Sequence, residues 1–355
     1  MLQCSSSIMS CEQIMISKIC IAGINGYTGQ LLKELISKHL HFKLVGSLGI
    51  SKQENKEYTY SLDELSAENF DVDFLLLATP AEISIEILQK LYEKNIKTKV
   101  LDLSGAFRLD KDLLASWYRL SHSIEGIEQG AKYGLSPYVK FTQQDTIIAN
   151  PGCYATCALL SLLPLLKHNL IKSNNIIIDA KSGVSGAGKK PRQDLMFSEM
   201  LNNFFPYKIG KHQHIPEILK ALAEFDIKED ELYFNTSMLP IHSGIAMTIY
   251  ADLNLETTTS EENIRGLVSD AYNKEYADYP LFKFIDIAAE TDSTEVSSFL
   301  SIKSIVGTPR THLGFSIKNN KIIIFSFIDN LLKGAVTQAI ENLNSYYGLP
   351  ITTGL

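Results

Sequence analysis

Cysteines are few in this sequence and long uncharged apolar segments are lacking, and each shortage excludes a class of protein. The 355 residues include five cysteines, an odd number that is too sparse for the disulfide framework of a small secreted protein. The first residues lack the basic start and continuous apolar core of a signal peptide. No window holds the ~18 uncharged apolar residues that a membrane helix requires. We therefore expect a soluble protein of a reducing compartment, the cytoplasm, without a membrane partner.

An excess of positive charge is also absent. The chain carries 33 basic and 40 acidic residues, which gives a net charge of −7. Its basic residues form no long run that could follow a phosphate backbone, so we expect no nucleic-acid partner. With 45% hydrophobic residues, the chain is long enough for two packed cores, because a single core rarely grows beyond about 250 residues.

The first half of the chain alternates strand-like with helix-like segments. Residues 1–14 precede this pattern, and we interpret them as a tail or a misassigned start, with Met15 as the alternative first residue. Short apolar strands separated by helices predict a parallel sheet that is covered on both faces. The predicted strands are 16–23, 42–48, 71–78, 98–104 and 146–150, and the predicted helices are 28–39 and 81–94.

The second half has more strands and fewer helices, which predicts a different kind of domain. The break at residues 150–152 precedes an apolar helix that begins at Cys153, and Pro164 is expected to end or kink this helix. The later strands predict an α+β domain around an antiparallel or mixed sheet. These strands are expected at 175–183, 232–239, 245–253, 299–306 and 322–328.

The last predicted element is one helix that ends at Gly348. Its apolar residues share one face, and Asp329 stands in the capping position at its start. Such a helix is long enough to return to the first domain.

Three glycines mark the end of the first predicted strand and the start of the first helix. Gly23, Gly26 and Gly29 stand where a backbone turn has to pass close to a dinucleotide pyrophosphate, which side chains would block. Their spacing is GxxGxxG rather than the more common GxGxxG, so a tight turn without a ligand is the alternative interpretation. The flanking strand and helix favour a dinucleotide site.

The end of the second predicted strand indicates which dinucleotide the site prefers. Many NAD-binding chains carry a carboxylate there for the ribose 2′-hydroxyl, but residues 47–51 contain none. Ser51 and Lys52 would accommodate a 2′-phosphate better than a carboxylate would. The sequence therefore favours NADP(H) as the cofactor.

Cys153 follows Asn-Pro-Gly and begins a predicted helix. The positive end of the helix dipole and the unpaired N–H groups there would lower the pKa of its thiol and favour the nucleophilic thiolate. The same N–H groups could hold the oxyanion that forms when a thiolate adds to a carbonyl. The alternative is a buried structural cysteine, and for Cys157, one helical turn further on, this is the only interpretation.

Seven short motifs occur in order across nearly the whole chain. They are GINGYTG, LDLSGAFRL, YGL, NPGCYAT, KSGVSGAGKK, HQHIPEI and DNLLKGA. Together, from residue 16 to the final Gly-Leu, they resemble the N-acetyl-gamma-glutamyl-phosphate reductase family, for which NPGCYAT and KSGVSGAG are highly specific. The resemblance implies NADPH-dependent reduction of N-acetyl-glutamyl 5-phosphate to the 5-semialdehyde plus phosphate, through a cysteine thioester, in arginine biosynthesis.

The resemblance also implies an architecture. A Rossmann-type NADP-binding domain would comprise residues 15–152 and 329–355, and a second domain for catalysis, substrate binding and oligomerisation would comprise residues 153–328. The implied partners are a small acyl phosphate and further copies of this chain, in a dimer or tetramer.

The same resemblance assigns roles to individual residues. The nucleophile is Cys153, and the catalytic histidine, the first of the HxHxPE motif, is His212. The residues assigned to the substrate are Arg108, Asn150, His214 and Glu217. The residues assigned to the cofactor are Gly23, Asn25, Gly26, Tyr27, Thr28, Gly29, Ser51, Ser182, Gly183 and Asn330.

Several of these residues have a second interpretation. A metal held by His212 and His214 lacks a third ligand of zinc-like spacing, so no metal is expected. Arg108 would suit either a surface salt bridge or an anion of the substrate. The basic loop 181–190 could be solvated, and Asn330 could support the cap of the last helix instead of holding the nicotinamide carboxamide.

Three departures from the family pattern bear on the substrate. Ala106 replaces the usual Asp before the Phe-Arg pair, and Ser243-Gly244 replaces an Arg-Gly pair. Pro309 stands where Asn is usual. Loss of the arginine at position 243 would weaken the binding of an anionic group of the substrate.

Other functions therefore stay open. Aspartate-semialdehyde dehydrogenases share this architecture and the thioester chemistry, but their cysteine motif differs and they lack the HxHxPE pattern. A reductase of an N-blocked aminoadipyl phosphate is a further alternative. A protein that senses NADP without turnover is the third, and the combination of Cys153, His212 and Arg108 argues against it.

Overall fold

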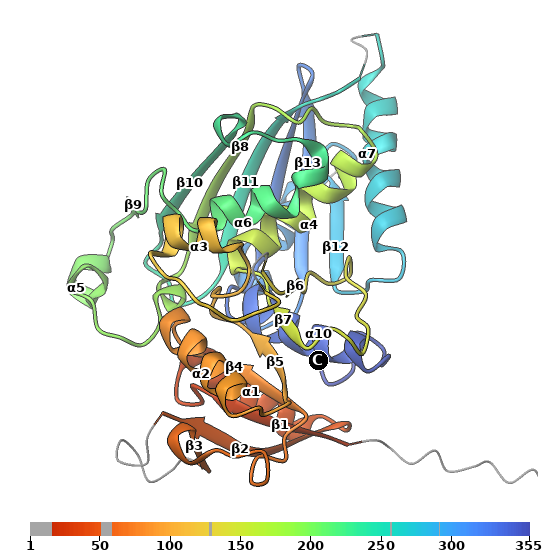
Figure 1. Ribbon diagram of the computed structural model, residues 1–355. Coiled ribbons are helices and arrows are strands. Elements are labelled where there is room, and N and C mark those ends of the chain that lie inside the picture. The colour runs from red at the N-terminus through yellow and green to blue at the C-terminus, as the bar shows by residue number, and fades with distance from the viewer. Residues whose placement is uncertain (1–15, 51–58, 128–129, 256–257, 291) are drawn as a thin grey trace, which may run out of the picture.

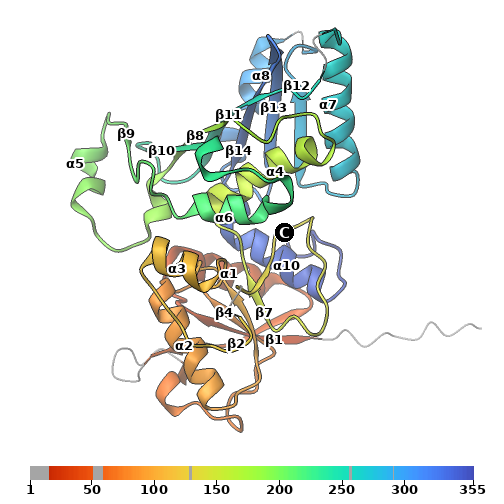
Figure 2. The ribbon, with the colours of Figure 1, turned by 45° about the horizontal axis from the view of Figure 1, so that its top comes forward.

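Two seven-stranded sheets, one toward each end of the molecule, form the framework of the fold (Figure 1). The computed structural model describes residues 16–50, 59–127, 130–255, 258–290 and 292–355. The C-terminal helix lies between the two sheets (Figure 2). The chain thus builds the first sheet, crosses to the second, and returns at its C-terminal end.

The first sheet has the strand order β3-β2-β1-β4-β5-β7-β6, and all of its strand pairs are parallel. Every residue of β4 and β7 is buried, as expected for apolar strands that are covered on both faces. The predicted parallel sheet is therefore confirmed. Its strands are β1 (Ser17–Ala22), β2 (Phe42–Gly49), β3 (Tyr60–Ser61), β4 (Phe74–Leu77), β5 (Lys99–Asp102), β6 (Lys132–Tyr133) and β7 (Ile147–Ala149).

Helices cover both faces of this sheet. Because side chains alternate along a strand, Ile19 and Ile21 of β1 belong to one core and Cys20 and Ala22 to another. The first core contains residues of α1 (Tyr27–Lys38) and α10 (Thr337–Tyr346). The second contains residues of α2 (Ala81–Glu93) and α3 (Lys111–Tyr118). The last helix thus packs on the sheet built by the start of the chain.

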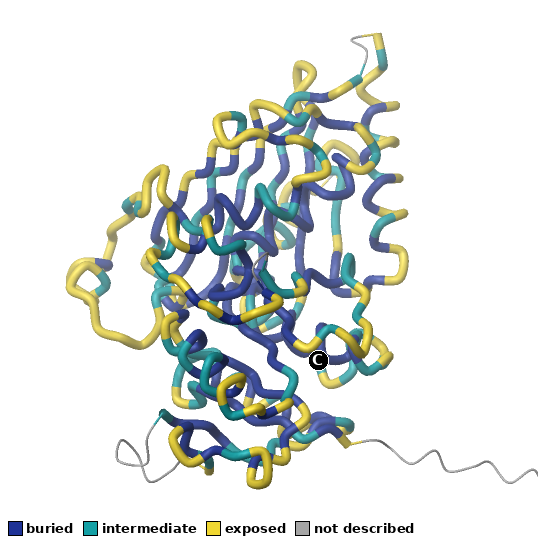
Figure 3. Tube along the Cα trace, viewed as in Figure 1, coloured by how far each residue is buried: buried dark blue, intermediate teal, exposed yellow. Residues whose placement is uncertain are grey.

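The second sheet is mixed, in the order β12-β13-β14-β11-β8-β10-β9. The pairs β8–β10 and β12–β13 are parallel and the others antiparallel. One face packs against the helices α4 (Cys153–Lys167), α6 (His214–Ala221) and α7 (Glu261–Tyr276), and this core is buried (Figure 3). The strands are β8 (Ile176–Ser182), β9 (Phe205–Pro206), β10 (Leu232–Met238), β11 (Ile245–Asp252), β12 (Phe282–Asp286), β13 (Thr311–Lys318) and β14 (Lys321–Ile328).

Helix α4 continues through Pro164 to Lys167 instead of ending there. A proline has no N–H to donate, so the carbonyl of Leu160 loses its helical partner. The hydroxyl of Tyr276, on α7, donates to this carbonyl at 2.5 Å, and α7 thereby replaces the missing hydrogen bond. Although α4 is strongly apolar, no helix in the described ranges is both long and apolar enough to cross a membrane.

The strand predicted at 299–306 is wrong. This segment contains the end of α8 (Ser293–Phe299) and the short helix α9 (Ile302–Ile305). The hydroxyl of Ser301 caps the start of α9 by accepting from the N–H of Ser304 at 3.2 Å. The apolar residues at 299, 302 and 305 recur every third position, which fits the period of a helix rather than the alternation of a strand. The strand that follows is β13.

The last element is not one uniform helix from Asp329 to Gly348. Leu332–Val336 forms a π-helical turn, η6, before α10 begins. The carboxylate of Asp329 accepts from the N–H groups of Leu331 and Leu332, so the predicted cap is present. Such turns often occur at functional sites, and this one adjoins Cys153.

The remaining elements are short. They are η1 (Leu62–Glu64), η2 (Val184–Ala187), η3 (Gln193–Leu195), α5 (Phe197–Met200), η4 (Ala223–Phe225) and η5 (Glu229–Glu231).

Candidate active site

Cys153 is the first residue of α4, at the crossing from the first sheet to the second. It is partly exposed, whereas the helix behind it is buried. Gly334, in the π-helical turn, lies so close that a Cβ added there would come within 2.6 Å of the Cβ of Cys153. The thiol therefore lies where the first sheet, the second sheet and the returning chain meet.

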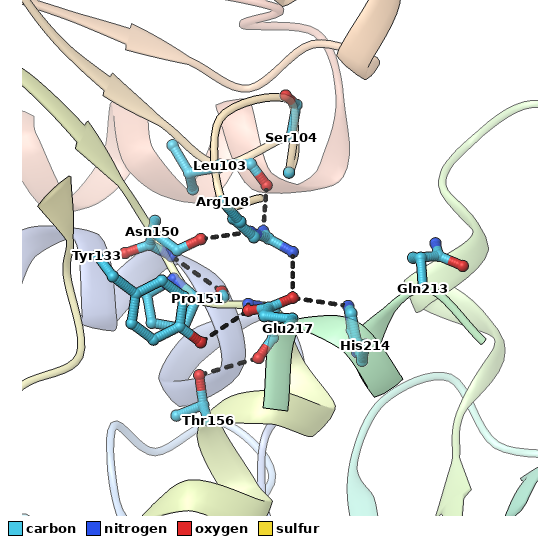
Figure 4. A network of polar contacts seen from close by, with 12 residues as sticks. Leu103, Ser104, Arg108, Tyr133, Asn150, Pro151, Thr156, Gln213, His214 and Glu217 are labelled. Carbon is cyan, nitrogen blue, oxygen red and sulfur yellow. Dashed lines mark hydrogen bonds and ion pairs between the residues drawn. The ribbon is translucent and has the colours of Figure 1, made fainter. Parts of the chain in front are cut away.

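A buried carboxylate holds the backbone just before Cys153 (Figure 4). Oε1 of Glu217 accepts from the N–H of Gly152 at 2.7 Å and from the hydroxyl of Tyr133 at 2.8 Å. Oε2 forms an ion pair with Nη1 of Arg108 at 3.2 Å. Since the side chains of Arg108 and Glu217 are 5% and 1% exposed, this pair fixes the start of α4 from the inside.

Arg108 and Asn150 extend this network. Nε of Arg108 donates to the carbonyl of Asn150 at 2.7 Å, and Nη2 donates to the carbonyl of Leu103 at 2.9 Å. The Asn150 amide accepts from Nδ2 of Asn342 at 3.0 Å and donates to the carbonyl of Ala335 at 3.1 Å. Asn150 therefore joins the cysteine loop to the last helix.

The structure thus brings together all four residues predicted for the substrate, Arg108, Asn150, His214 and Glu217. Most of their polar atoms, however, bond to one another or to the backbone. The alternative of a surface salt bridge for Arg108 is wrong, because the pair is buried. A direct substrate contact stays a prediction, and the hydrogen bonds present indicate that Glu217 and Asn150 position the nucleophile.

The expected lowering of the Cys153 pKa is wrong. Burial raises the pKa of this thiol to about 11. The charge of Arg108 and the backbone N–H groups of Tyr154 and of Cys153 itself lower it, which is the effect predicted from the helix start. Burial outweighs them, so the resting residue is a neutral thiol.

We expect the alkylation of Cys153 by iodoacetamide to become about tenfold faster with each pH unit between about 7 and 10, because only the thiolate reacts. The rate would be followed by mass spectrometry of the labelled peptide. Cys157 provides an internal control, since burial raises its pKa to about 12 and hides its side chain. A rate that levels off below about pH 9 would contradict this prediction.

His212 packs against Tyr154, the residue after Cys153, and their ring centres are 5.3 Å apart. Its Nδ1 accepts from the backbone N–H of His214 at 3.2 Å, so a neutral ring carries its proton on Nε2. Burial, His214 and Lys208 lower the pKa of His212 to about 2. With so low a pKa, His212 would not act as a general base near neutral pH. The geometry gives it the role of a neutral Nε2–H donor.

His214 is also neutral and buried. Burial and the charge of Arg108 lower its pKa, and its Nε2 lies 3.9 Å from Oε2 of Glu217. A Cβ added at Gly152 would come within 2.2 Å of this nitrogen. The glycine before Cys153 is therefore required by the imidazole that packs against it.

The three glycines of the predicted dinucleotide loop connect β1 to α1. A Cβ at Gly23, where φ is +80°, would lie 2.3 Å from the carbonyl oxygen of Ala78, and one at Gly29 would lie 2.2 Å from that of Gly23. A Cβ at Gly26 would meet nothing closer than 3.4 Å. Packing within the chain requires the first and third glycines, whereas the second leaves the open space that a pyrophosphate at this helix start would need.

Asn330 lies at the other end of the predicted cofactor site. Its side chain accepts from the N–H of Gly244 at 2.7 Å and donates to the hydroxyl of Ser185 at 3.0 Å. The helix cap is formed by Asp329 instead, so the capping alternative for Asn330 is wrong. Ser182 ends β8, and the N–H of Gly183 donates to the carbonyl of Gly244 at 2.9 Å, so both lie next to the residues that Asn330 contacts. The predicted Ser51 lies outside the described residues.

The basic loop contains a residue whose position was not predicted. Nζ of Lys189 donates to the carbonyl of Asn25 at 2.8 Å and to Oε1 of Gln30 at 2.9 Å, and it lies 5.2 Å from the ring centre of Tyr27. The loop of the second sheet is thus tied to the glycine loop of the first. Tyr133, Lys189 and Gly334 all fall within the motifs quoted above, but no spacing rule distinguishes them from their neighbours.

Two family models match the chain. The one described as "Semialdehyde dehydrogenase, NAD binding domain" matches residues 18–141, and the one described as "Semialdehyde dehydrogenase, dimerisation domain" matches residues 153–330. Among solved structures, aspartate semialdehyde dehydrogenase II of Vibrio cholerae, complexed with ASA, has a TM-score of 0.66 at 15% identity over 93% of this chain and 98% of that one. The Candida albicans enzyme with NADP has a TM-score of 0.58 at 14% identity, over 93% and 99%. At such identities the similarity concerns the fold alone.

Two relatives found by sequence have higher identities than these solved structures. A protein of Bacillus anthracis named N-acetyl-gamma-glutamyl-phosphate reductase is 37% identical in an alignment that covers 95% of this chain and 98% of the relative. A Streptococcus thermophilus protein of the same name is 34% identical, with the same coverage of both chains. Identity over almost the full length of both chains shows that this chain belongs to the N-acetyl-gamma-glutamyl-phosphate reductase family.

Proposed function

We propose that this protein catalyses the NADPH-dependent reduction of N-acetyl-L-glutamyl 5-phosphate to N-acetyl-L-glutamate 5-semialdehyde and phosphate. The observation that carries the proposal is the position of Cys153. Its thiol lies at the junction of the two sheets, its preceding peptide is bound by Glu217, and Gly334 closes against it. The relatives that span the whole chain are named for this activity.

The described residues fit a nicotinamide dinucleotide. The glycine loop with Asn25, Tyr27 and Thr28 would hold the pyrophosphate, and Ser182, Gly183 and Asn330 would hold the nicotinamide end. A Cβ at Gly186 would lie 3.7 Å from Nδ2 of Asn330, which is ordinary van der Waals contact. When bound, the cofactor supplies the two electrons of the reduction.

The residues of this chain would act on the acyl group in the following way. Sγ of Cys153 forms a bond to the acyl carbon while the bond to the phosphate oxygen breaks and the leaving phosphate takes the thiol proton, which gives a thioester and releases phosphate. The N–H of Gly152 is occupied by Glu217, so the N–H groups of Cys153 and Tyr154 are the ones left at this helix start to stabilise the oxyanion. Nε2–H of His212 would be a further hydrogen-bond donor to this oxyanion. The Cys153 thiolate that is released with the aldehyde would regain its proton from water.

Assembly and location follow the same proposal. We infer a homo-oligomer that uses residues 153–328, which the family model of a dimerisation domain largely covers, while residues 15–152 and 329–355 bind the cofactor. The cytoplasm stays the compartment predicted from the cysteine content.

The substrate is tested by phosphate-dependent NADP reduction with N-acetyl-glutamate semialdehyde, aspartate semialdehyde and an aminoadipate analogue in parallel. The two alternative substrates are included because Ser243 replaces the usual arginine. Its hydroxyl forms hydrogen bonds to Nδ1 of His242 at 2.7 Å and to the hydroxyl of Ser185 at 3.2 Å. We expect kcat/KM for the first substrate to exceed the others by at least about 100-fold. A preference for either rival would change the substrate, and no turnover despite NADPH binding would favour the sensor.

A further inference from the structure

A pocket of about 480 Å³ lies beside the glycine loop, between α1 and the end of β2. The described residues that line it are Ile24, Asn25, Gln30, Lys33, Leu44, Val45, Gly46, Ser47 and Thr59. Asn25 and Gln30 are the two residues to which Lys189 donates. One end of the pocket is therefore the glycine loop, where a pyrophosphate would lie, and the other is the carboxyl end of β2.

This arrangement identifies the part of a dinucleotide that the pocket would take. In a parallel sheet of this kind the adenosine ribose lies against the end of the second strand, which here is β2 with Gly46 and Ser47. An acidic residue at that place would hold a free 2′-hydroxyl. The described lining residues include no carboxylate, so nothing among them favours the unphosphorylated ribose.

Lys33 is the only charged residue among the described residues of the lining. It lies one helical turn after Gln30, so both side chains share the same face of α1. Lys38, on the same helix, pairs with Glu34 at 2.6 Å, whereas Lys33 forms no ion pair with the part of the chain that the structure describes. Its ammonium is thus free to meet an anion in the pocket.

We propose that Lys33 binds the 2′-phosphate of NADPH and thereby selects NADPH over NADH. The inference rests on the proposed function, because it assumes a nicotinamide dinucleotide in this pocket. It assigns the selection to a residue of α1, in addition to the segment after β2 that contains Ser51 and Lys52.

Binding of ligand pairs that differ only by this phosphate tests the proposal. The Lys33→Ala protein is titrated calorimetrically with NADPH and NADH, and with adenosine 2′,5′-bisphosphate and AMP as fragments. We expect Kd for the two 2′-phosphorylated ligands to rise about tenfold or more, since a charge-assisted hydrogen bond is lost. Kd for NADH and AMP should stay within about twofold, and Lys38→Ala should behave as wild type with all four.

Other outcomes would overturn the inference. If Kd rises equally for the 2′-phosphorylated and the unphosphorylated ligands, Lys33 supports the pyrophosphate or the fold. If no Kd changes, Lys33 does not contact the bound ligand. Lys33→Glu provides a second variant, in which the preference for NADPH should fall further. If the wild-type protein binds no dinucleotide, the proposed function is wrong as well. If the wild type turns over with NADPH and Lys33→Ala keeps the wild-type Kd values, this inference alone is wrong.

Discussion

Replacing Cys153 with serine is expected to lower kcat/KM for the phosphate-dependent oxidation of N-acetyl-glutamate semialdehyde by about 10⁴-fold or more. A serine hydroxyl would keep the geometry, but it ionises far less readily than a thiol. The nearby imidazoles cannot compensate, because burial lowers the pKa of His212 to about 2 and lowers that of His214. The variant would therefore have the same fold without a group able to attack the carbonyl carbon of the semialdehyde.

The matched control is Cys157→Ser, one helical turn further along α4. Cys157 is buried and its sulfur lies 3.3 Å from the hydroxyl of Ser326, so a serine there keeps the hydrogen bond. We expect this variant to retain activity within about threefold. NADPH binding should be unchanged in both variants. Substantial turnover by Cys153→Ser would mean that the reduction proceeds without a thioester.

The sequence was informative where one pattern dominates locally. Short apolar strands such as 74–77 alternate with helices, and this predicted the parallel sheet correctly. Segment 299–306 was assigned wrongly because its phenylalanine, isoleucines and valine are residues typical of strands. The spacing of positions 299, 302 and 305 and the cap at Ser301 both favour a helix. The π-helical turn at 332–336 depends on contacts with Cys153 and with the second sheet, which are remote in the sequence.

The candidate site shows a similar division. Motifs identified Arg108, Asn150, Cys153 and Glu217 as members of one site, and the structure brings them together. Which atoms bond to which depends on the tertiary arrangement. The pKa of Cys153 illustrates this, because the helix start has its expected effect and the burial imposed by distant elements exceeds it.

A second buried polar cluster lies behind the site, in the last helical element. Lys333 and Glu341 are both 0% exposed, and Nζ of Lys333 lies 2.9 Å from Oε1 of Glu341. Nζ also donates to Gln338 at 2.6 Å and to the hydroxyl of Tyr279, which itself donates to Glu341 at 2.5 Å. Since Lys333 precedes Gly334, this cluster anchors the turn that touches Cys153 to α10 and to Tyr279, which belongs to the core of the second sheet.

Replacing Lys333 with methionine is therefore expected to destabilise the protein by about 3–5 kcal/mol, because it leaves a buried carboxylate without its cation. Burial raises the pKa of Glu341 and Lys333 lowers it, so the variant should hold this carboxyl protonated up to a higher pH. A folded-state pKa above the unfolded value gives stability that is present at low pH and lost as pH rises. The deficit in thermal stability should accordingly be smallest near about pH 5 and grow toward about pH 8.

The double variant Lys333→Met/Glu341→Leu separates charge from packing. Removing both charges eliminates the unpaired carboxylate, so thermal unfolding at a fixed protein concentration should show more than half of the lost stability restored. The double variant should also lose the pH dependence of the single one. Equal deficits in the two variants at every pH would show that shape rather than charge holds the turn beside Cys153.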